Sequence, residues 1–155
     1  MNELSVNTVC NDVLEDLDAT ALAERLESGE VTSMELVEAA IKRAEQANPK
    51  LNAIVTKTFD MAREQAKGPR KGRLGGIPTF IKDNVEVQGV PTLFGTRALP
   101  RTSSKKDHAF IKQFKSLGMI SLGKTALPEF GIPPTTDSLL HGATAQMAHF
   151  YGLPF

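Results

Sequence analysis

The sequence of 155 residues has no excess of charge, because its 18 basic and 18 acidic residues cancel. The balance argues against a nucleic-acid-binding protein that relies on bulk positive charge, and against an acidic disordered tail. No apolar run reaches about 18 residues, so the sequence predicts no membrane span. The single cysteine, Cys10, can form neither an internal disulfide nor a thiolate metal cluster.

The first 18 residues also lack the features of a secretory signal peptide. They are acidic and have neither a basic start nor an apolar segment. Basic residues elsewhere do not alternate with aromatic ones, and no RNA-binding motif occurs. We therefore expect a cytoplasmic protein of ordinary globular composition, with neither a nucleic acid nor a membrane as partner.

The neutral total hides a division of the chain. Residues 1–67 hold 13 acidic and 7 basic residues, whereas residues 68–155 hold 5 acidic and 11 basic ones. Nineteen of the 21 glycines and prolines lie in the second part. The first part is expected to be helical and the second rich in turns. A solvated surface is sufficient to explain the positive charge of the second part.

Helices and strands can be placed by apolar spacing and by capping residues. The expected helices span residues 19–28, 33–48, 59–67 and 107–117, and the expected strands 51–56, 77–81 and 119–123. Asp18 is suited to begin the first helix and Thr32 or Ser33 the second, with Glu35 three residues after Thr32 as in a capping box. Asn48-Pro49 is suited to end the second helix. The helix, glycine turn and strand of residues 107–123 form an αβ unit, which favours the α/β class.

One candidate site lies where the strand of residues 77–81 ends. Lys82 follows this apolar run directly, and Asp83 and Asn84 come next. Burial lowers the pKa of a lysine, so a lysine at the end of a buried strand can accept a proton. Asp83 and Asn84 could orient Lys82 or cap the following loop. The plainer alternative is a solvated lysine at a strand end.

Other polar residues suggest no further site. Gly123-Lys124-Thr125 does not fit a phosphate-binding loop, because the required first glycine, Gly118, opens a strand where it should close one. We therefore expect Lys124 to be a strand-end or surface residue. The remaining candidates are three histidines with no usual zinc spacing, and nothing points to a metal or an organic cofactor: His108, His141 and His149.

Two stretches taken together resemble the N-terminal part of the amidase signature family. The first runs from Gly75-Gly76-Ile77-Pro78 into Ile81-Lys82-Asp83-Asn84 and on to Gly95-Thr96, and the second is residues 118–131. The resemblance extends from about residue 19 to residue 144. It implies a mixed sheet wrapped by helices, of which this chain supplies an incomplete part. Residues 1–17 would be a weakly ordered lead-in, residues 18–144 the amidase-like part, and residues 145–155 a tail foreign to the family.

The resemblance also implies a mechanism. Family members hydrolyse amides with a Ser–Ser–Lys arrangement, in which the lysine acts through a middle serine on a nucleophilic serine. Lys82 is the only catalytic residue that can be carried over. The glycine- and serine-rich segment that carries the middle serine in the family does not occur in this sequence, and Ser103-Ser104 lacks its glycine context. The nucleophilic serine of the family lies further along the chain than that segment. The chain is therefore expected to be inactive alone.

Three interpretations remain open at this point. The chain is an incomplete amide hydrolase, an interaction module that completes a separately encoded C-terminal half, or a non-functional remnant. Small aliphatic or aromatic amides, fatty amides and the glutamine used in tRNA-linked transamidation are all possible family substrates. An uncovered sheet edge would lower the stability of the chain and favour self-association.

Overall fold

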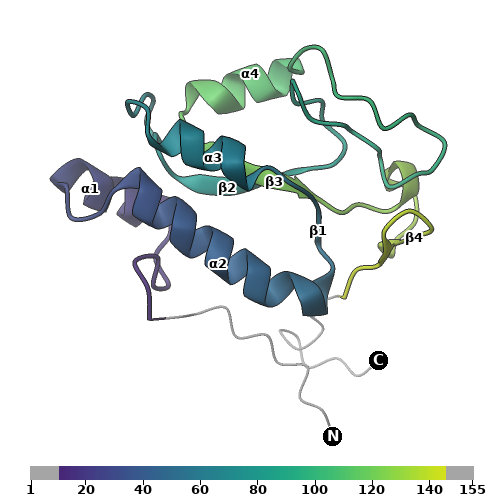
Figure 1. Cartoon of the computed structure of the whole chain (residues 1–155), viewed down its shortest axis with the longest axis horizontal. Coiled ribbons are helices and arrows are strands. Elements are labelled where there is room, and N and C mark those ends of the chain that lie inside the picture. Colours follow the sequence, from purple (N-terminus) through teal and green to yellow (C-terminus); the bar gives the residue numbers. More distant parts are fainter. Residues whose placement is uncertain (1–10, 146–155) are drawn as a thin grey trace, which may run out of the picture.

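The computed structural model describes residues 11–145 (Figure 1). The helical part of the chain comes first, as the division of glycine and proline predicts. Its elements are α1 (Ala19–Ser28), α2 (Ser33–Leu51), β1 (Ile54–Lys57) and α3 (Phe59–Ala66). The later elements are β2 (Pro78–Lys82), α4 (Ala109–Ser116), β3 (Ile120–Thr125), the 3-10 helix η1 (Glu129–Gly131), β4 (Asp137–Ser138) and β5 (Gly142–Ala143).

The main sheet has three strands in the order β1-β3-β2. β1 is antiparallel to β3, and β2 is parallel to it, so the sheet is mixed as expected. Gly123 lets β1 approach β3 closely, because a Cβ atom built on this residue would lie 2.1 Å from the carbonyl oxygen of Thr56. The parallel pairing places Lys82 opposite Thr125, so β2 and β3 end side by side.

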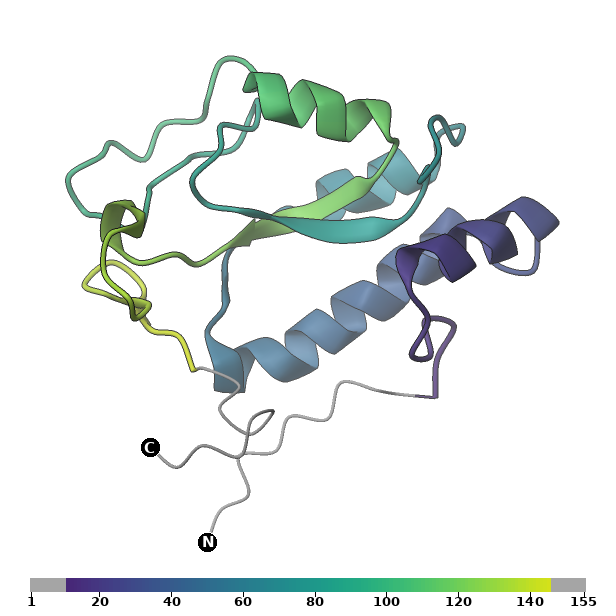
Figure 2. The ribbon, with the colours of Figure 1, turned by 180° about the vertical axis from the view of Figure 1, so that it is seen from behind.

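Helices cover both faces of this sheet. On one face, α2 and α3 pack on β3 through a core cluster that includes Val37, Ile41, Ala62 and Leu122. Figure 2 shows α3 behind β2 and β3. On the opposite face, Ile111 of α4 is fully buried in a second cluster, where it meets Ile81 of β2. The sheet is therefore the middle layer of an α/β structure, which confirms the predicted class.

The starts of the first two helices follow from their capping residues. The side chain of Asp18 accepts hydrogen bonds from the N–H groups of Thr20 and Ala21, at 2.9 Å each. Thr32 and Glu35 form the reciprocal capping box expected from their spacing. Both predicted N-termini are confirmed.

The predicted end of α2 is wrong. The helix continues through Pro49 to Leu51 and ends with Asn52 in the left-handed conformation. Asn48 explains the difference, because its side-chain oxygen accepts hydrogen bonds from the N–H groups of Ala53 and Ile54, at 2.9 and 2.7 Å. These bonds fix the chain just beyond the helix and stabilise its last turn despite the proline.

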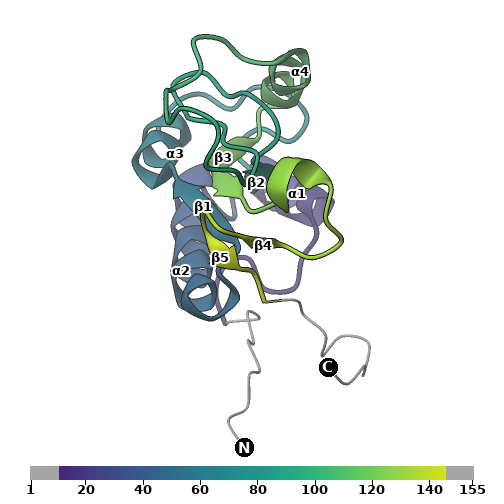
Figure 3. The same ribbon diagram turned by 90° about the vertical axis from the view of Figure 1, so that its right-hand side faces the viewer.

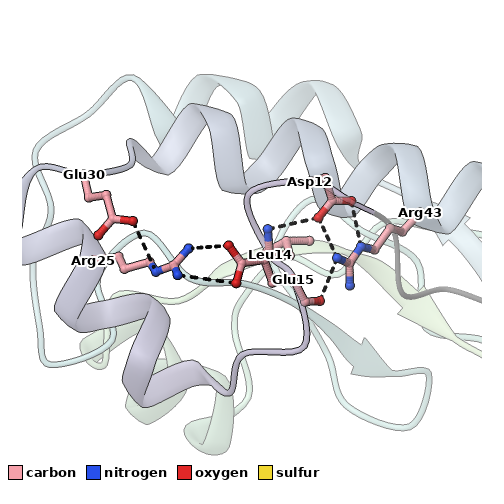
Figure 4. Close-up of polar contacts among 6 residues, drawn as sticks. All are labelled: Asp12, Leu14, Glu15, Arg25, Glu30 and Arg43. Atoms are coloured by element: carbon pink, nitrogen blue, oxygen red, sulfur yellow. Dashed lines mark hydrogen bonds and ion pairs between the residues drawn. The ribbon is translucent and has the colours of Figure 1, made fainter.

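The segment before α1 is better packed than expected of a weakly ordered lead-in. In the described residues 11–17, Leu14 is buried against the cluster formed by α1 and α2. Arg43 of α2 donates to the carboxylate of Asp12 from Nε at 2.8 Å and to the carbonyl of Glu15 at 2.8 Å (Figure 4). These contacts attach Asp12, Leu14 and Glu15 to the first two helices, while the weak order expected of residues 1–17 as a whole stays a prediction.

Apolar spacing in residues 107–117 predicts one buried face that consists of Phe110, Ile111, Phe114 and Leu117, and this prediction is only partly correct. Ile111 is buried, but Phe110 and Leu117 are 53% and 42% exposed. Gly118 ends the segment in the left-handed region, as predicted, with φ of 81°. α4 therefore buries a narrower stripe than its sequence suggests.

The hairpin of β4 and β5 lies against the C-terminal end of α2 (Figure 3). The side-chain amide of Asn52 donates to the carbonyls of His141 and Ala143, at 2.7 and 3.0 Å. Ala145 in turn donates to the carbonyl of Leu51. These contacts bring the last described residues back to the first half of the chain. The predicted tail of residues 145–155 lies outside the described residues, apart from Ala145.

Candidate active site

The candidate site lies at the carboxyl ends of β2 and β3. The loops that leave these strands, together with η1 and β4, gather at one end of the molecule, on the right of Figure 1. Open α/β sheets commonly bind ligands at the carboxyl ends of their strands. The fold therefore places the segment around Lys82 at a suitable position.

Lys82, the predicted catalytic residue, is exposed. The strand alternates, so that Ile81 faces the α4 layer and Lys82 points away from it. The sequence predicts a lysine desolvated at the end of a buried strand, and the described chain does not desolvate it. The geometry here matches the plainer alternative, a lysine facing solvent where the strand ends.

The buried lysine of the site is Lys124. Its side chain and that of Asp83 are each 1% exposed, and Lys124 Nζ lies 2.8 Å from Asp83 Oδ1. Lys124 also donates to Thr92 Oγ1 at 3.0 Å. Of the two positions expected for Lys124, the strand end is confirmed, because only Thr125 follows it in β3, whereas the surface position is wrong.

One signal in the sequence could have located Lys124 in the interior. Because successive side chains of a strand point to opposite faces, Lys124 is expected on the same face of β3 as Ile120 and Leu122, which are both buried. Its partner could not be found in the same way, because Asp83 lies 41 residues away and a register shift separates Thr79 from Ile81 where β2 pairs with β3. The same placement, within β3, confirms that Gly123-Lys124-Thr125 is not a phosphate-binding loop.

Asp83 joins the end of β2 to its neighbours through main chain and side chain. Its N–H donates to the carbonyl of Thr125 at 2.9 Å, and its carbonyl accepts from Phe94 at 3.2 Å. The second carboxylate oxygen, Oδ2, accepts from the N–H of Leu93 at 3.2 Å. Asp83 therefore caps the loop after Lys82, one of the two functions expected for it, whereas the neighbouring Asn84 is exposed.

A second contact joins the loop after β2 to η1. The buried hydroxyl of Thr96 donates to the carboxylate of Glu129, and Phe130 donates its N–H to the carbonyl of Phe94 at 2.8 Å. The rings of Phe94 and Phe130 stack with centroids 6.5 Å apart. Both residues have φ near +50°, a conformation that non-glycine residues adopt only where surrounding contacts hold them. The sequence offered no signal for this arrangement.

The two histidines of the described residues, His108 and His141, lie in separate elements. His108 begins α4, where its ring nitrogen accepts from Phe110 at 3.2 Å. His141 lies in the β4–β5 hairpin, and its Nε2 is a buried nitrogen without a hydrogen-bond partner among the described residues. Burial lowers the pKa of His141, the positive charge of Arg101 adds to this, and the carboxylate of Asp83 opposes it. His149 lies outside the described residues.

No group of three His, Cys, Asp or Glu side chains within residues 11–145 is placed to hold a metal ion. Over the same range, no helix is both long enough and apolar enough to cross a membrane.

Ser103 forms a single β-bridge with Pro91, and Ser104 forms one with Gln88. The two serines therefore brace the loop after β2.

Comparison with known proteins decides the family. A family model described as Amidase matches residues 35–146, which include Lys82, Asp83 and Lys124. The chain belongs to this amidase family. The resemblance deduced from the two glycine-containing stretches is thereby confirmed.

Individual amidases match over most of this chain. The putative amidase AmiC of Mycobacterium tuberculosis is 44% identical over 134 residues, which make up 85% of this chain and 28% of the relative. The 6-aminohexanoate-cyclic-dimer hydrolase of Paenarthrobacter ureafaciens is 35% identical over 130 residues, or 82% of this chain and 26% of the relative.

A solved structure of 6-aminohexanoate cyclic dimer hydrolase in complex with substrate aligns with a TM-score of 0.79 and 33% sequence identity. The alignment covers 84% of this chain and 27% of that structure. The chain thus spans between a quarter and a third of the length of the curated relatives that it matches.

Proposed function

We propose that this chain carries the lysine-bearing part of a hydrolase of carboxylic amide C–N bonds. In this enzyme Lys82 is the base, and it acts through a middle serine on the serine that attacks the amide. The observation that carries the proposal is the family match across residues 35–146 together with the position of Lys82 at the carboxyl end of β2. The serines would come from sequence beyond these 155 residues, because the chain spans about 28% of its relatives.

The chemistry assigns each group a task. A serine hydroxyl becomes nucleophilic when a base removes its proton, and a lysine can be that base where water is excluded from it. The attacking oxygen would then form a tetrahedral intermediate, whose oxyanion needs N–H donors. Because Lys82 is exposed in the described residues, the surfaces that cover it belong to the missing part of the enzyme. This supports the expectation that the chain alone is inactive.

The first experiment measures amide hydrolysis by the chain alone. We expect no turnover that depends on Lys82. Turnover that disappears in the Lys82→Ala variant and persists in Lys112→Ala would contradict the expectation of inactivity. Lys112 is a suitable control because it is another exposed lysine, on α4.

The second experiment supplies the missing part. Residues 19–145 replace the matching segment of 6-aminohexanoate-cyclic-dimer hydrolase, and the graft is assayed on the cyclic dimer that gives this relative its name. We expect hydrolysis by the graft and by its Lys112→Ala variant, and loss of hydrolysis in Lys82→Ala. A folded graft whose turnover is unchanged by Lys82→Ala would refute the assignment of Lys82.

A docking function is favoured by exposed surface at the same end of the molecule. β2 is an edge strand, and the apolar side chains of Phe130, Ile132 and Leu139 are 50%, 82% and 79% exposed. Unpaired edges and apolar side chains of this kind suit association with another polypeptide. Light scattering of the chain, with and without the rest of the hydrolase as a separate polypeptide, tests this. A monomer that binds nothing favours the non-functional remnant.

A further inference from the structure

A buried ion pair joins Asp83, the residue after the proposed base Lys82, to Lys124 of β3. Lys124 and Asp83 are each 1% exposed, although both are charged residues. Lysine and aspartate are almost never fully buried unless they are paired, because removal of their hydration is costly. Apolar residues of similar size often stabilise a fold equally well at such positions. Stability alone is therefore a weak explanation for these two charges.

The side-chain hydrogen bonds of the pair lead to the segment that follows β2. Asp83 uses both carboxylate oxygens, Oδ1 for Lys124 Nζ and Oδ2 for the N–H of Leu93. Lys124 reaches Thr92 Oγ1 at 3.0 Å, and that hydroxyl donates to the carbonyl of Val85 at 3.3 Å. The pair therefore ties β3 to both ends of the loop that leaves β2 at residue 83 and returns at residue 93.

Main-chain hydrogen bonds continue this connection on either side of the pair. The N–H of Asp83 donates to Thr125, at the end of β3, and Phe94 donates to the carbonyl of Asp83. Lys82 lies directly before Asp83 and opposite Thr125 in the sheet. The position of the Lys82 backbone thus depends on the segment that the buried pair holds.

We propose that Lys124 and Asp83, with Thr92, act as positioning residues that hold the backbone of Lys82 at one place on the sheet edge. The proposal rests on the proposed function, in which Lys82 is the base. Lys124 itself already donates to Asp83 and Thr92 and lies in the interior, so it does not compete with Lys82 as the reactive amine. A charged pair suits this task because its hydrogen bonds specify direction, which apolar packing does not.

Hydrogen exchange in the full chain tests the positioning directly. The variants are Lys124→Met and the double variant Lys124→Met/Asp83→Leu. The double variant removes both charges, so it is expected to keep the fold even if the single variant does not. We expect at least tenfold faster exchange at the amides of residues 83 and 94, both of which bond to main-chain carbonyls. The amides of Ala62 and Ile120, away from the pair, serve as the reference.

The pattern of exchange decides the outcome. Faster exchange confined to residues 83 and 94 in the double variant supports positioning. Equal acceleration at Ala62 and Ile120 shows that the pair merely stabilises the whole fold, and unchanged exchange shows that apolar residues hold the segment equally well. Either of the last two results overturns the proposal.

Kinetics of the hydrolase graft provide the second measurement. We expect the double variant to lower kcat by tenfold or more with little change in KM, because a misplaced base affects the chemical step. Lys112→Ala should leave both constants unchanged. A kcat within twofold of the parent graft overturns the proposal, even if exchange is faster. If turnover never depends on Lys82, the proposed function fails, while the exchange result still decides whether the pair holds the segment.

Discussion

The ion pairs of two regions of this molecule differ chiefly in burial. In the helical region, Arg25 lies 3.0 Å from Glu15 and 3.5 Å from Glu30, at the surface (Figure 4). At the sheet edge, Lys124 and Asp83 are 2.8 Å apart and 1% exposed. Surface pairs contribute little to stability, since water screens them and their side chains lose conformational freedom. In the interior, removing one partner leaves the charge of the other buried without compensation, which costs much more stability.

The pair of Arg43 and Asp12 is intermediate between the two. Both side chains are 18% exposed, and Arg43 also donates to the carbonyl of Glu15. This pair connects the segment before α1 to α2, so it holds together parts of the chain that are distant in sequence. The comparison therefore predicts three different costs for removing one charge, and these can be measured.

The largest loss of stability is expected for Lys124→Met. Removing one partner leaves Asp83 charged and buried, which typically costs about 3–5 kcal/mol of unfolding free energy. Urea denaturation measures this loss. The matched variant Lys124→Met/Asp83→Leu should recover most of it, because neither charge is then left alone. A loss below about 1 kcal/mol for Lys124→Met would show that water reaches the pair and that burial does not distinguish it from the surface pairs.

An intermediate loss is expected for Arg43→Met. The substitution removes charge-assisted hydrogen bonds to Asp12, which are worth about 1.5–3 kcal/mol when well formed. Partial exposure places the expected effect near the lower figure. Arg43→Lys keeps the charge but loses the forked geometry, so it should recover only part of the stability. Equal stability of the Met and Lys variants would mean that the fork itself is unimportant.

The same pair predicts a dependence on pH. The hydrogen bond from Arg43 lowers the pKa of Asp12, burial opposes this, and the N–H of Leu14 adds to it. A carboxyl whose pKa is lower in the folded state stabilises the fold above its unfolded pKa of about 3.9 and loses this contribution as the pH falls. Thermal unfolding between pH 6 and pH 3 should therefore show a smaller acid-induced decrease for Arg43→Met than for the parent chain. Parallel curves would contradict this explanation.

Much of the fold could be predicted because its signals are local. Asp18, Thr32 and Glu35 act within one helical turn, so their sequence positions identify the two helix starts. The end of α2 could not be predicted from the rule for proline, because Asn48 compensates through bonds to residues that follow the helix.

The site was less accessible to sequence reasoning, for a physical reason. The motif around Lys82 identified the family and the strand, but the exposure of a side chain depends on which layers surround it. Lys82 ends β2 and Lys124 lies one residue before the end of β3, yet one side chain is exposed and the other is buried against the distant Asp83. The alternation of side chains along β3 indicates a buried position for Lys124, but no short-range pattern identifies Asp83 as its partner.

The smallest effect on stability is expected for Lys82→Met, although Lys82 lies at the same end of the sheet as Lys124, where the largest effect is expected. Lys82 is exposed, and substitutions of exposed residues outside specific contacts usually change stability by less than about 0.5 kcal/mol. Urea denaturation of the chain should therefore give nearly the parent value, whereas the same substitution should abolish turnover in the hydrolase graft. A large loss of stability for Lys82→Met would mean that this lysine, like Lys124, holds the sheet edge together. Its proposed catalytic function would then have to be separated from a structural one before any loss of turnover could be interpreted.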